Sequence, residues 1–235
     1  MDYSKQLKVL AIGNSFSDDA MEHLYHIAES YGVEKITLGN LYIGGASLEL
    51  HHINSLTDEY VYYYRKNTNG IWETTENVSL QAGIQDEAWD VFTVQQVSYL
   101  SGIVDSYQPQ LHYLIKYIKE LQRNSEAKIG WHMTWAYQED SDHSEFYLYN
   151  QSQMQMYQGI IDAVKANIVQ NPEIDFIIPA GSTIQNLRTS YLGDTITRDG
   201  FHLSFNIGRL AAGMTYFKSI TGLSLEGISY MPEEV

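Results

Sequence analysis

The sequence predicts an α/β fold, a three-layer α/β/α sandwich in which a five-stranded parallel sheet lies between two layers of helices. Five short apolar runs recur along the chain, and each is nearly continuous rather than alternating. This pattern is typical of strands that are buried on both faces. Helical patterns separate the runs, and an alternation of strands and helices favours right-handed crossovers between parallel strands.

The individual elements follow from local signals. The predicted strands occupy residues 9–12, 36–38, 91–94, 129–133 and 176–179. Asp18 or Asp19 is expected to cap a first helix that continues to about Tyr31, because acidic residues are favourable at a helix start. Apolar residues at spacings of three and four predict further helices over about residues 111–118, 157–168 and 206–220.

One stretch breaks this alternation and predicts a β-hairpin insertion. Asn69-Gly70 lies between two β-prone runs at residues 60–64 and 71–75, and this dipeptide favours tight hairpin turns. We therefore expect a two-stranded insertion at residues 60–76, between the second and third strands of the sheet. The length of 235 residues suits a single domain over residues 1–235.

Composition excludes several classes of function. The chain has 14 basic and 29 acidic residues and a formal net charge of −15, which argues against binding to nucleic acid or to anionic membrane surfaces. The absence of cysteine excludes disulfides, thiol catalysis and cysteine-ligated metal sites. No apolar run approaches the length of a membrane span, so no membrane insertion is expected. Residues 1–5 show no hydrophobic signal-peptide core, and this observation does not identify the compartment. The sequence does not identify the oligomeric state either.

The first strand ends in Gly13-Asn14-Ser15-Phe16-Ser17, and a helix is predicted to follow it. Open α/β sheets bind their ligands at the carboxyl ends of the strands. Ser15 lies at such a strand end, where a nucleophile could reach a bound ligand. The alternative is that Ser15 only caps the helix, a position that serine favours.

A second candidate lies near the other end of the chain, in Asp199-Gly200-Phe201-His202. An aspartate can fix the tautomer of a histidine three residues away while that histidine takes a proton from a serine. The alternative is an Asp-Gly turn with an incidental histidine. The position of this motif before the last helix, together with Ser15 after the first strand, favours the catalytic interpretation.

These motifs resemble those of the SGNH hydrolases, the GDSL-like esterase superfamily, and more narrowly an uncharacterised branch with Gly-Asn-Ser-Phe-Ser as its first block. The resemblance covers nearly the whole chain and rests on ordered blocks at residues 13–17, 44–48 and 199–202. It implies a flavodoxin-like sandwich and a serine hydrolase that needs no metal or other cofactor.

The third block departs from the superfamily pattern. Most members carry Gly-x-Asn-Asp after the third strand, where the asparagine donates to the oxyanion, but here the strand runs into Gln95-Gln96-Val97-Ser98. Some carbohydrate acetylesterases of the superfamily use a glutamine at this place, and a glutamine amide offers the same donor. Gln95 is favoured because it directly ends the apolar run, and Gln96 is the alternative.

The resemblance assigns a role to each residue of the constellation. Ser15 is expected to be the nucleophile, His202 the general base and then the general acid, and Asp199 the residue that orients His202. The backbone N–H groups of Ser15 and Gly45 and the side chain of Gln95 would form the oxyanion hole.

Five further residues are candidates for the substrate pocket, namely Asn14, Phe16, His51, His132 and Trp135. For His132 and Trp135 a buried pair in the core is an equal alternative. His51 and His52 lack the spacing of a zinc site, so no metal is expected there.

We therefore expect a serine esterase or deacylase that removes a small acyl group, with acetyl favoured, from a small-molecule or carbohydrate ester. Two alternatives remain open. One is a lipid or thioester hydrolase, and the other is a catalytically weak or silent carbohydrate-binding module on the same fold.

Overall fold

The computed structural model of the chain describes residues 2–233 and contains a seven-stranded sheet in the order β4-β3-β2-β1-β5-β6-β7. Five neighbouring strands pair in parallel, as predicted; they are β1 (Gln6–Gly13), β2 (Lys35–Tyr42), β5 (Val91–Val94), β6 (Lys128–His132) and β7 (Phe176–Ile178). They lie at the positions of the five apolar runs and form the centre of the fold.

The predicted hairpin is present as β3 (Tyr62–Asn67) and β4 (Trp72–Val78). The prediction of five strands was too low, because the hairpin joins the sheet: β3 pairs antiparallel with β2 and β4 pairs with β3. An unpaired edge leaves backbone donors and acceptors free, and β3 satisfies those of β2. At the turn, Asn67 Oδ1 accepts a hydrogen bond of 2.8 Å from the N–H of Gly70.

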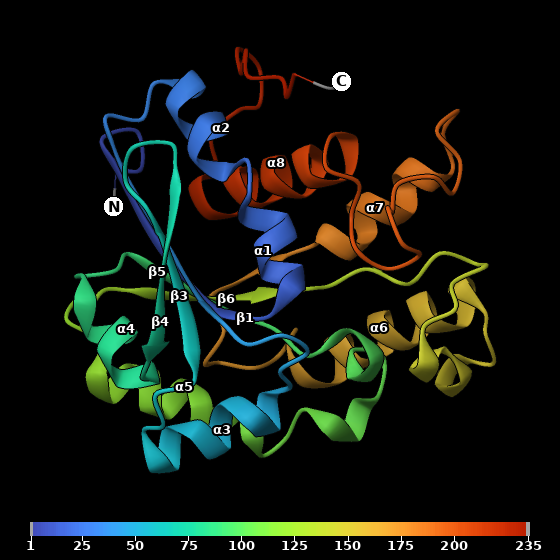
Figure 1. Ribbon diagram of the computed structural model, residues 1–235, viewed down its shortest axis with the longest axis horizontal. Coiled ribbons are helices and arrows are strands. Elements are labelled where there is room, and N and C mark those ends of the chain that lie inside the picture. Colours follow the sequence, from blue (N-terminus) through green and yellow to red (C-terminus); the bar gives the residue numbers. More distant parts are fainter. Residues whose placement is uncertain (1, 234–235) are drawn as a thin grey trace.

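Helices cover both faces of the sheet (Figure 1). One layer contains α1 (Ser15–Met21), α2 (Leu24–Tyr31), α7 (Ala180–Arg188) and α8 (Ile207–Thr221). The other contains α3 (Leu48–Thr57), α4 (Leu80–Asp86), α5 (Gln110–Leu121) and α6 (Gln153–Asn167). The three-layer α/β/α sandwich predicted from the sequence is therefore confirmed.

The first helix differs from its prediction in two respects. It is divided into α1 and α2, with Glu22 and His23 between them, and its N-cap is Asn14 rather than Asp18 or Asp19. The side chain of Asn14 accepts the N–H of Phe16 at 2.9 Å, which satisfies one of the free donors at a helix start. Because Asn14 fills the capping position, the Ser15 side chain is not needed for capping.

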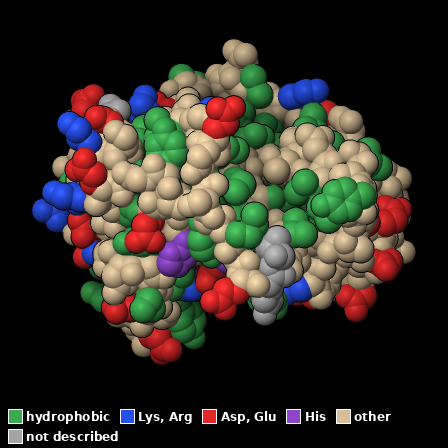
Figure 2. Space-filling view, turned by 90° about the horizontal axis from the view of Figure 1, so that it is seen from above, with side chains coloured by type: hydrophobic (Ala, Val, Ile, Leu, Met, Phe, Trp, Pro, Cys, Tyr) green, Lys and Arg blue, Asp and Glu red, His purple; other side chains and the backbone are tan. Residues whose placement is uncertain are grey.

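The sheet and its two helix layers enclose a core with many aromatic side chains. Trp89, Trp131 and Trp135 are among the largest side chains that are fully buried. Within residues 2–233, no helix is both long and apolar enough to cross a membrane. On the face that includes α2, α7 and α8, acidic and basic side chains are interspersed (Figure 2), in keeping with the absence of a basic footprint in the sequence.

Candidate active site

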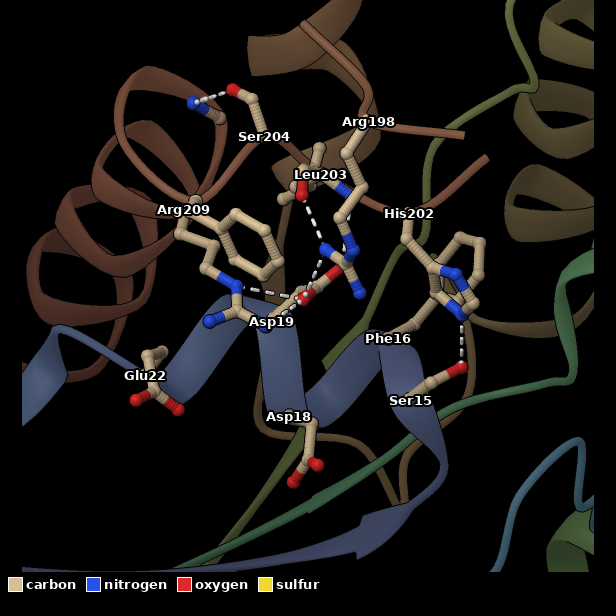
Figure 3. Close-up of polar contacts among 12 residues, drawn as sticks. Ser15, Phe16, Asp18, Asp19, Glu22, Arg198, His202, Leu203, Ser204 and Arg209 are labelled. Atoms are coloured by element: carbon tan, nitrogen blue, oxygen red, sulfur yellow. Dashed lines mark hydrogen bonds and ion pairs between the residues drawn. The ribbon is translucent and has the colours of Figure 1, made fainter. Parts of the chain in front are cut away.

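Ser15, His202 and Asp199 form a continuous series of hydrogen bonds, although Ser15 and His202 are 187 positions apart. Ser15 Oγ lies 2.8 Å from His202 Nε2, and His202 Nδ1 lies 2.6 Å from Asp199 Oδ2. A carboxylate can only accept, so Nδ1 carries a proton, and Nε2 faces the hydroxyl of Ser15, from which it can accept. The structure thus brings the three predicted catalytic residues together (Figure 3 shows Ser15 and His202).

A tight loop before α8 holds Asp199 and His202 in this arrangement. Asp199 Oδ1 accepts the backbone N–H groups of His202 at 2.7 Å and of Phe201 at 3.2 Å. Gly200 has φ = +89°, and a Cβ at this position would lie 3.1 Å from the backbone of Ser141. Glycine is therefore required in the middle of the motif.

Hydrogen bonds set the charge of Asp199. Partial burial alone would raise its pKa, but the side chain of His202 and the N–H groups of His202 and Phe201 donate to it and hold the pKa below its ordinary value. The carboxylate is therefore ionised at neutral pH, and it can stabilise an imidazolium on His202.

A cavity of about 650 Å³ opens beside Ser15 and His202. Its walls combine aromatic rings with hydroxyl, imidazole and carboxylate groups, from Phe16, Tyr42, Ser98, Tyr99, His143, Ser144, Glu145 and Phe201. This size and this mixed lining are typical of a small-molecule site. Asn14, Gly44 and Gly45 also line it, so the loops after β1 and β2 both reach the cavity.

Gly45 and Ser15 present backbone donors on the same cavity. Gly45 has φ = +66°, a conformation that glycine adopts at no steric cost. In the part of the chain that the structure describes, the N–H groups of Ser15 and Gly45 donate no hydrogen bond within the protein. Both are therefore available to an oxygen of a bound substrate.

The two glutamines after β5 are not among the residues that line the cavity, and the donor role expected for one of them stays a prediction. Gln95 is buried; its Nε2 donates to Asn14 Oδ1 at 2.9 Å and its Oε1 contacts His132 Nδ1 at 2.9 Å. Gln96 is also buried; its Oε1 accepts from Leu48 N and its Nε2 donates to Ser106 O at 2.8 Å. Both amides therefore have their partners inside the protein, as a buried polar group requires.

Of the five predicted pocket residues, Asn14 and Phe16 line the cavity and the other three do not. His51 and His132 are fully enclosed, and burial lowers the pKa of His51 to about 4 and that of His132 to about 3. Both rings are therefore neutral. Trp135 is buried as well, but it stacks on Phe16 with ring centroids 4.3 Å apart and donates to the carbonyl of Phe201 at 2.7 Å. It supports two walls of the cavity from behind.

Sequence reasoning missed the walls that come from loops. His143, Ser144 and Glu145 belong to the segment between β6 and α6, and Tyr99 follows β5 in a short 3₁₀ helix. None of these residues stands in a motif. Two other wall residues carried a signal, because Phe201 lies inside the Asp-x-x-His motif and Ser98 lies in the third block.

The site has no evident place for a metal ion. Among residues 2–233, no group of three or more His, Asp or Glu side chains is arranged to hold one.

The chain matches one protein family and is similar to several solved structures. A family model described as "Domain of unknown function (DUF4886)" matches residues 8–235. A crystal structure of a DUF4886 family protein from Bacteroides uniformis is similar with a TM-score of 0.91 and 44% identity, over 97% of this chain and 88% of that one. No curated protein matches the chain.

More distant structures share the fold. A protein from Slackia heliotrinireducens that is provisionally named an SGNH hydrolase has a TM-score of 0.58 and 18% identity, over 92% of this chain and 100% of that one. A catalytic mutant of an acetylxylan esterase from Geobacillus stearothermophilus has a TM-score of 0.59 and 11% identity, over 96% and 98% of the two chains. At these identities the likeness concerns the fold alone, which is that of the SGNH hydrolases.

Proposed function

Because the chain belongs to the DUF4886 family, which is described only as a domain of unknown function, we propose an activity from the residues of its own site. The protein is a serine esterase that removes a small acyl group, acetyl in the first place, from a hydroxylated, carbohydrate-like alcohol. The observation that carries this proposal is the hydrogen-bonded series from Asp199 through His202 to Ser15.

The series supports acyl transfer in two steps. In the first, Ser15 Oγ attacks the carbonyl carbon of the ester while His202 Nε2 takes the hydroxyl proton, and the ionised Asp199 stabilises the imidazolium. The imidazolium then gives this proton to the departing alcohol, which leaves an acyl group on Ser15. In the second step, His202 activates a water that releases the carboxylic acid and restores Ser15.

Negative charge develops on the carbonyl oxygen in both steps. The N–H groups of Ser15 and Gly45 are the donors that we assign to this oxygen, and one such donor is typically worth about 2.7–4 kcal/mol of the barrier. In this assignment Gln95 does not donate to the carbonyl oxygen. It holds Asn14, which caps the helix of the nucleophile.

The lining of the cavity supports a hydroxylated alcohol. The lining residues Tyr42, Tyr99 and Ser144 carry hydroxyl groups and Glu145 carries a carboxylate, so several hydrogen-bonding groups surround one small volume. Such groups suit the hydroxyls of a sugar better than a long acyl chain, which requires a continuous apolar groove. One distant neighbour is named an acetylxylan esterase, which suggests acetylated sugars as the first substrates to test.

A binding module is the second candidate, and one observation favours it. The side-chain donor that most SGNH hydrolases carry in their third block has no counterpart that faces the cavity here, because both glutamine amides are bonded elsewhere. A site that lacks this donor would be a slower catalyst.

A covalent serine probe separates the two candidates. A fluorophosphonate should label the wild-type protein and fail to label Ser15→Ala. Ser144→Ala is the matched control, because Ser144 lines the same cavity but, among the described residues, its hydroxyl is not hydrogen-bonded to a histidine as that of Ser15 is, and this variant should be labelled normally. Hydrolysis of acetyl, butyryl and longer-chain esters then measures the acyl preference. Absence of both labelling and hydrolysis in the wild type would favour the binding module.

A further inference from the structure

Asp19 is a buried carboxylate that lies one helical turn after Ser15 on α1, and it is only 1% exposed. Its Oδ1 accepts from Arg198 Nη1 at 2.9 Å and from Arg209 Nε at 2.8 Å. Its Oδ2 accepts the backbone N–H of Leu203 at 2.8 Å. These contacts join three separate segments of the chain at one side chain (Figure 3).

Two of these contacts hold the two ends of the loop that carries Asp199 and His202. Arg198 directly precedes Asp199, and Leu203 directly follows His202. The loop is closed at the same place, because the N–H of Arg198 donates to the carbonyl of His202 at 2.9 Å and the Arg198 guanidinium donates to the carbonyl of Leu203. The carboxylate of Asp19 therefore sits at the base of the loop.

The ring of Phe205 packs against both arginines of the cluster. The guanidinium carbons of Arg198 and Arg209 lie 4.8 Å and 4.7 Å from the centroid of the Phe205 ring. Hydrogen bonds to a carboxylate that is out of water are strong and directional. Removing one partner would leave charged groups uncompensated, so the arrangement has little freedom to shift.

We infer that Asp19 is a positioning residue that sets the distance between Ser15 Oγ and His202 Nε2. Ser15 and Asp19 belong to the same helix, whereas His202 belongs to a loop far along the chain. The hydrogen bond between Ser15 and His202 is one link between this helix and that loop. The contacts of Asp19 add a link to each end of the loop. This inference rests on the proposed function for its kinetic consequences, but not for its geometric one.

The neighbouring residue Asp18 provides a matched control. It lies on the same helix and carries the same charge, but it pairs with Arg65 on the hairpin at 2.8 Å and accepts from Asn40. In Figure 3 its side chain points away from the loop. Asp18→Asn and Asp19→Asn remove the same charge from one helix, and only the second disturbs the base of the loop.

The kinetic test compares these two variants on one acetyl ester. Asp19→Asn should lower kcat by about 10²-fold, as expected for a misplaced catalytic group, and should change KM only a few-fold. Asp18→Asn should leave kcat within a few-fold of the wild type. In a His202→Ala background, Asp19→Asn should cause no further loss, because Asp19 acts through His202. An unchanged kcat in folded Asp19→Asn would overturn the inference.

A structural readout keeps the inference testable whatever the activity proves to be. In crystals of Asp19→Asn the distance between Ser15 Oγ and His202 Nε2 should exceed hydrogen-bonding range, while Asp18→Asn should retain about the 2.8 Å of the wild type. A retained hydrogen bond in Asp19→Asn would refute the positioning role. A wild type without esterase activity would refute the proposed function but not this role. If Asp19→Asn fails to fold, Arg198→Lys provides the same two readings, since lysine lacks the guanidinium fork.

Discussion

Gln95 Nε2 donates a hydrogen bond of 2.9 Å to Asn14 Oδ1, so the glutamine that directly follows β5 supports the residue before Ser15 and is not among the residues that line the cavity. The same Asn14 oxygen accepts the N–H of Phe16, and its Nδ2 donates to the carbonyl of Ala46 at 3.0 Å. Asn14 thereby connects the helix that begins at Ser15, the loop after β2 and the residue that follows β5.

This relationship predicts a stability effect for Gln95→Leu. The change leaves His132 Nδ1 and one acceptor site of Asn14 unpaired in the core, so the free energy of unfolding should fall by about 1–3 kcal/mol. The kcat on an acetyl ester should fall less than 10²-fold, because no donor is lost from the oxyanion. Urea unfolding and steady-state kinetics measure the two effects. A loss of 10²–10³-fold at unchanged stability would restore Gln95 as a direct donor.

The hydrogen-bonded series predicts that three substitutions abolish most of the esterase activity. Ser15→Ala removes the nucleophile and His202→Ala removes the base. Asp199→Asn should reduce kcat by on the order of 10⁴-fold, because it favours the wrong tautomer of the imidazole. Rates on one acetyl ester, with circular dichroism to establish folding, provide the measurement. Substantial activity in folded Ser15→Ala would exclude Ser15 as the nucleophile.

The buried histidines predict that the protein becomes less stable in mild acid. In the unfolded chain His51 and His132 titrate near pH 6.5, whereas burial lowers the pKa to about 4 for His51 and about 3 for His132 in the folded state. At pH values between the folded and unfolded pKa of each histidine, the unfolded state binds more protons than the folded state. The stability that the two neutral rings contribute is therefore complete above pH 6.5 and is lost as the pH falls.

His51→Gln tests this dependence without touching the cavity. The free energy of unfolding of the wild type should decrease from pH 7 to pH 4.5, and that of His51→Gln should decrease less, because one of the two rings is gone. Urea unfolding at several pH values checks the slopes. Equal slopes would mean that His51 is not held neutral in the folded protein.

The cavity wall predicts a role for Glu145 in binding the alcohol. A carboxylate that accepts from a substrate hydroxyl makes a hydrogen bond of about 1.5–3 kcal/mol. Glu145→Gln should therefore raise KM for an acetylated sugar by roughly 10-fold, a factor that corresponds to 1.4 kcal/mol. It should leave KM for a simple phenyl acetate unchanged, because that substrate has no hydroxyl to offer.

Asp142→Asn is the control for Glu145, since Asp142 is an exposed carboxylate in the same loop that does not line the cavity. It should alter neither KM. An equal rise in KM for both substrates in Glu145→Gln would indicate a general change in the loop and would count against a hydroxylated alcohol.

Much of the architecture could be predicted because it depends on local patterns. Runs such as residues 91–94 are apolar on both faces, and Asn69-Gly70 favours one kind of turn, so the parallel strands and the hairpin were correctly placed. That the hairpin would pair with β2 could not be predicted. Pairing between strands depends on which edge of the sheet is left open, and no local pattern records that.

The sequence by itself determined which residues are available for the chemistry. Ser15 follows the first strand, and Asp199 and His202 stand three apart before the last helix, so the sequence alone shows their order and spacing. Only the tertiary structure decided where side chains at the strand ends point. Gln95 and His132 turn inward because each satisfies a buried partner, and Asp19 meets Arg209 across 190 positions. Periodicity and motifs report local conformation, whereas these contacts depend on how separate elements pack, which is why they emerged only from the fold.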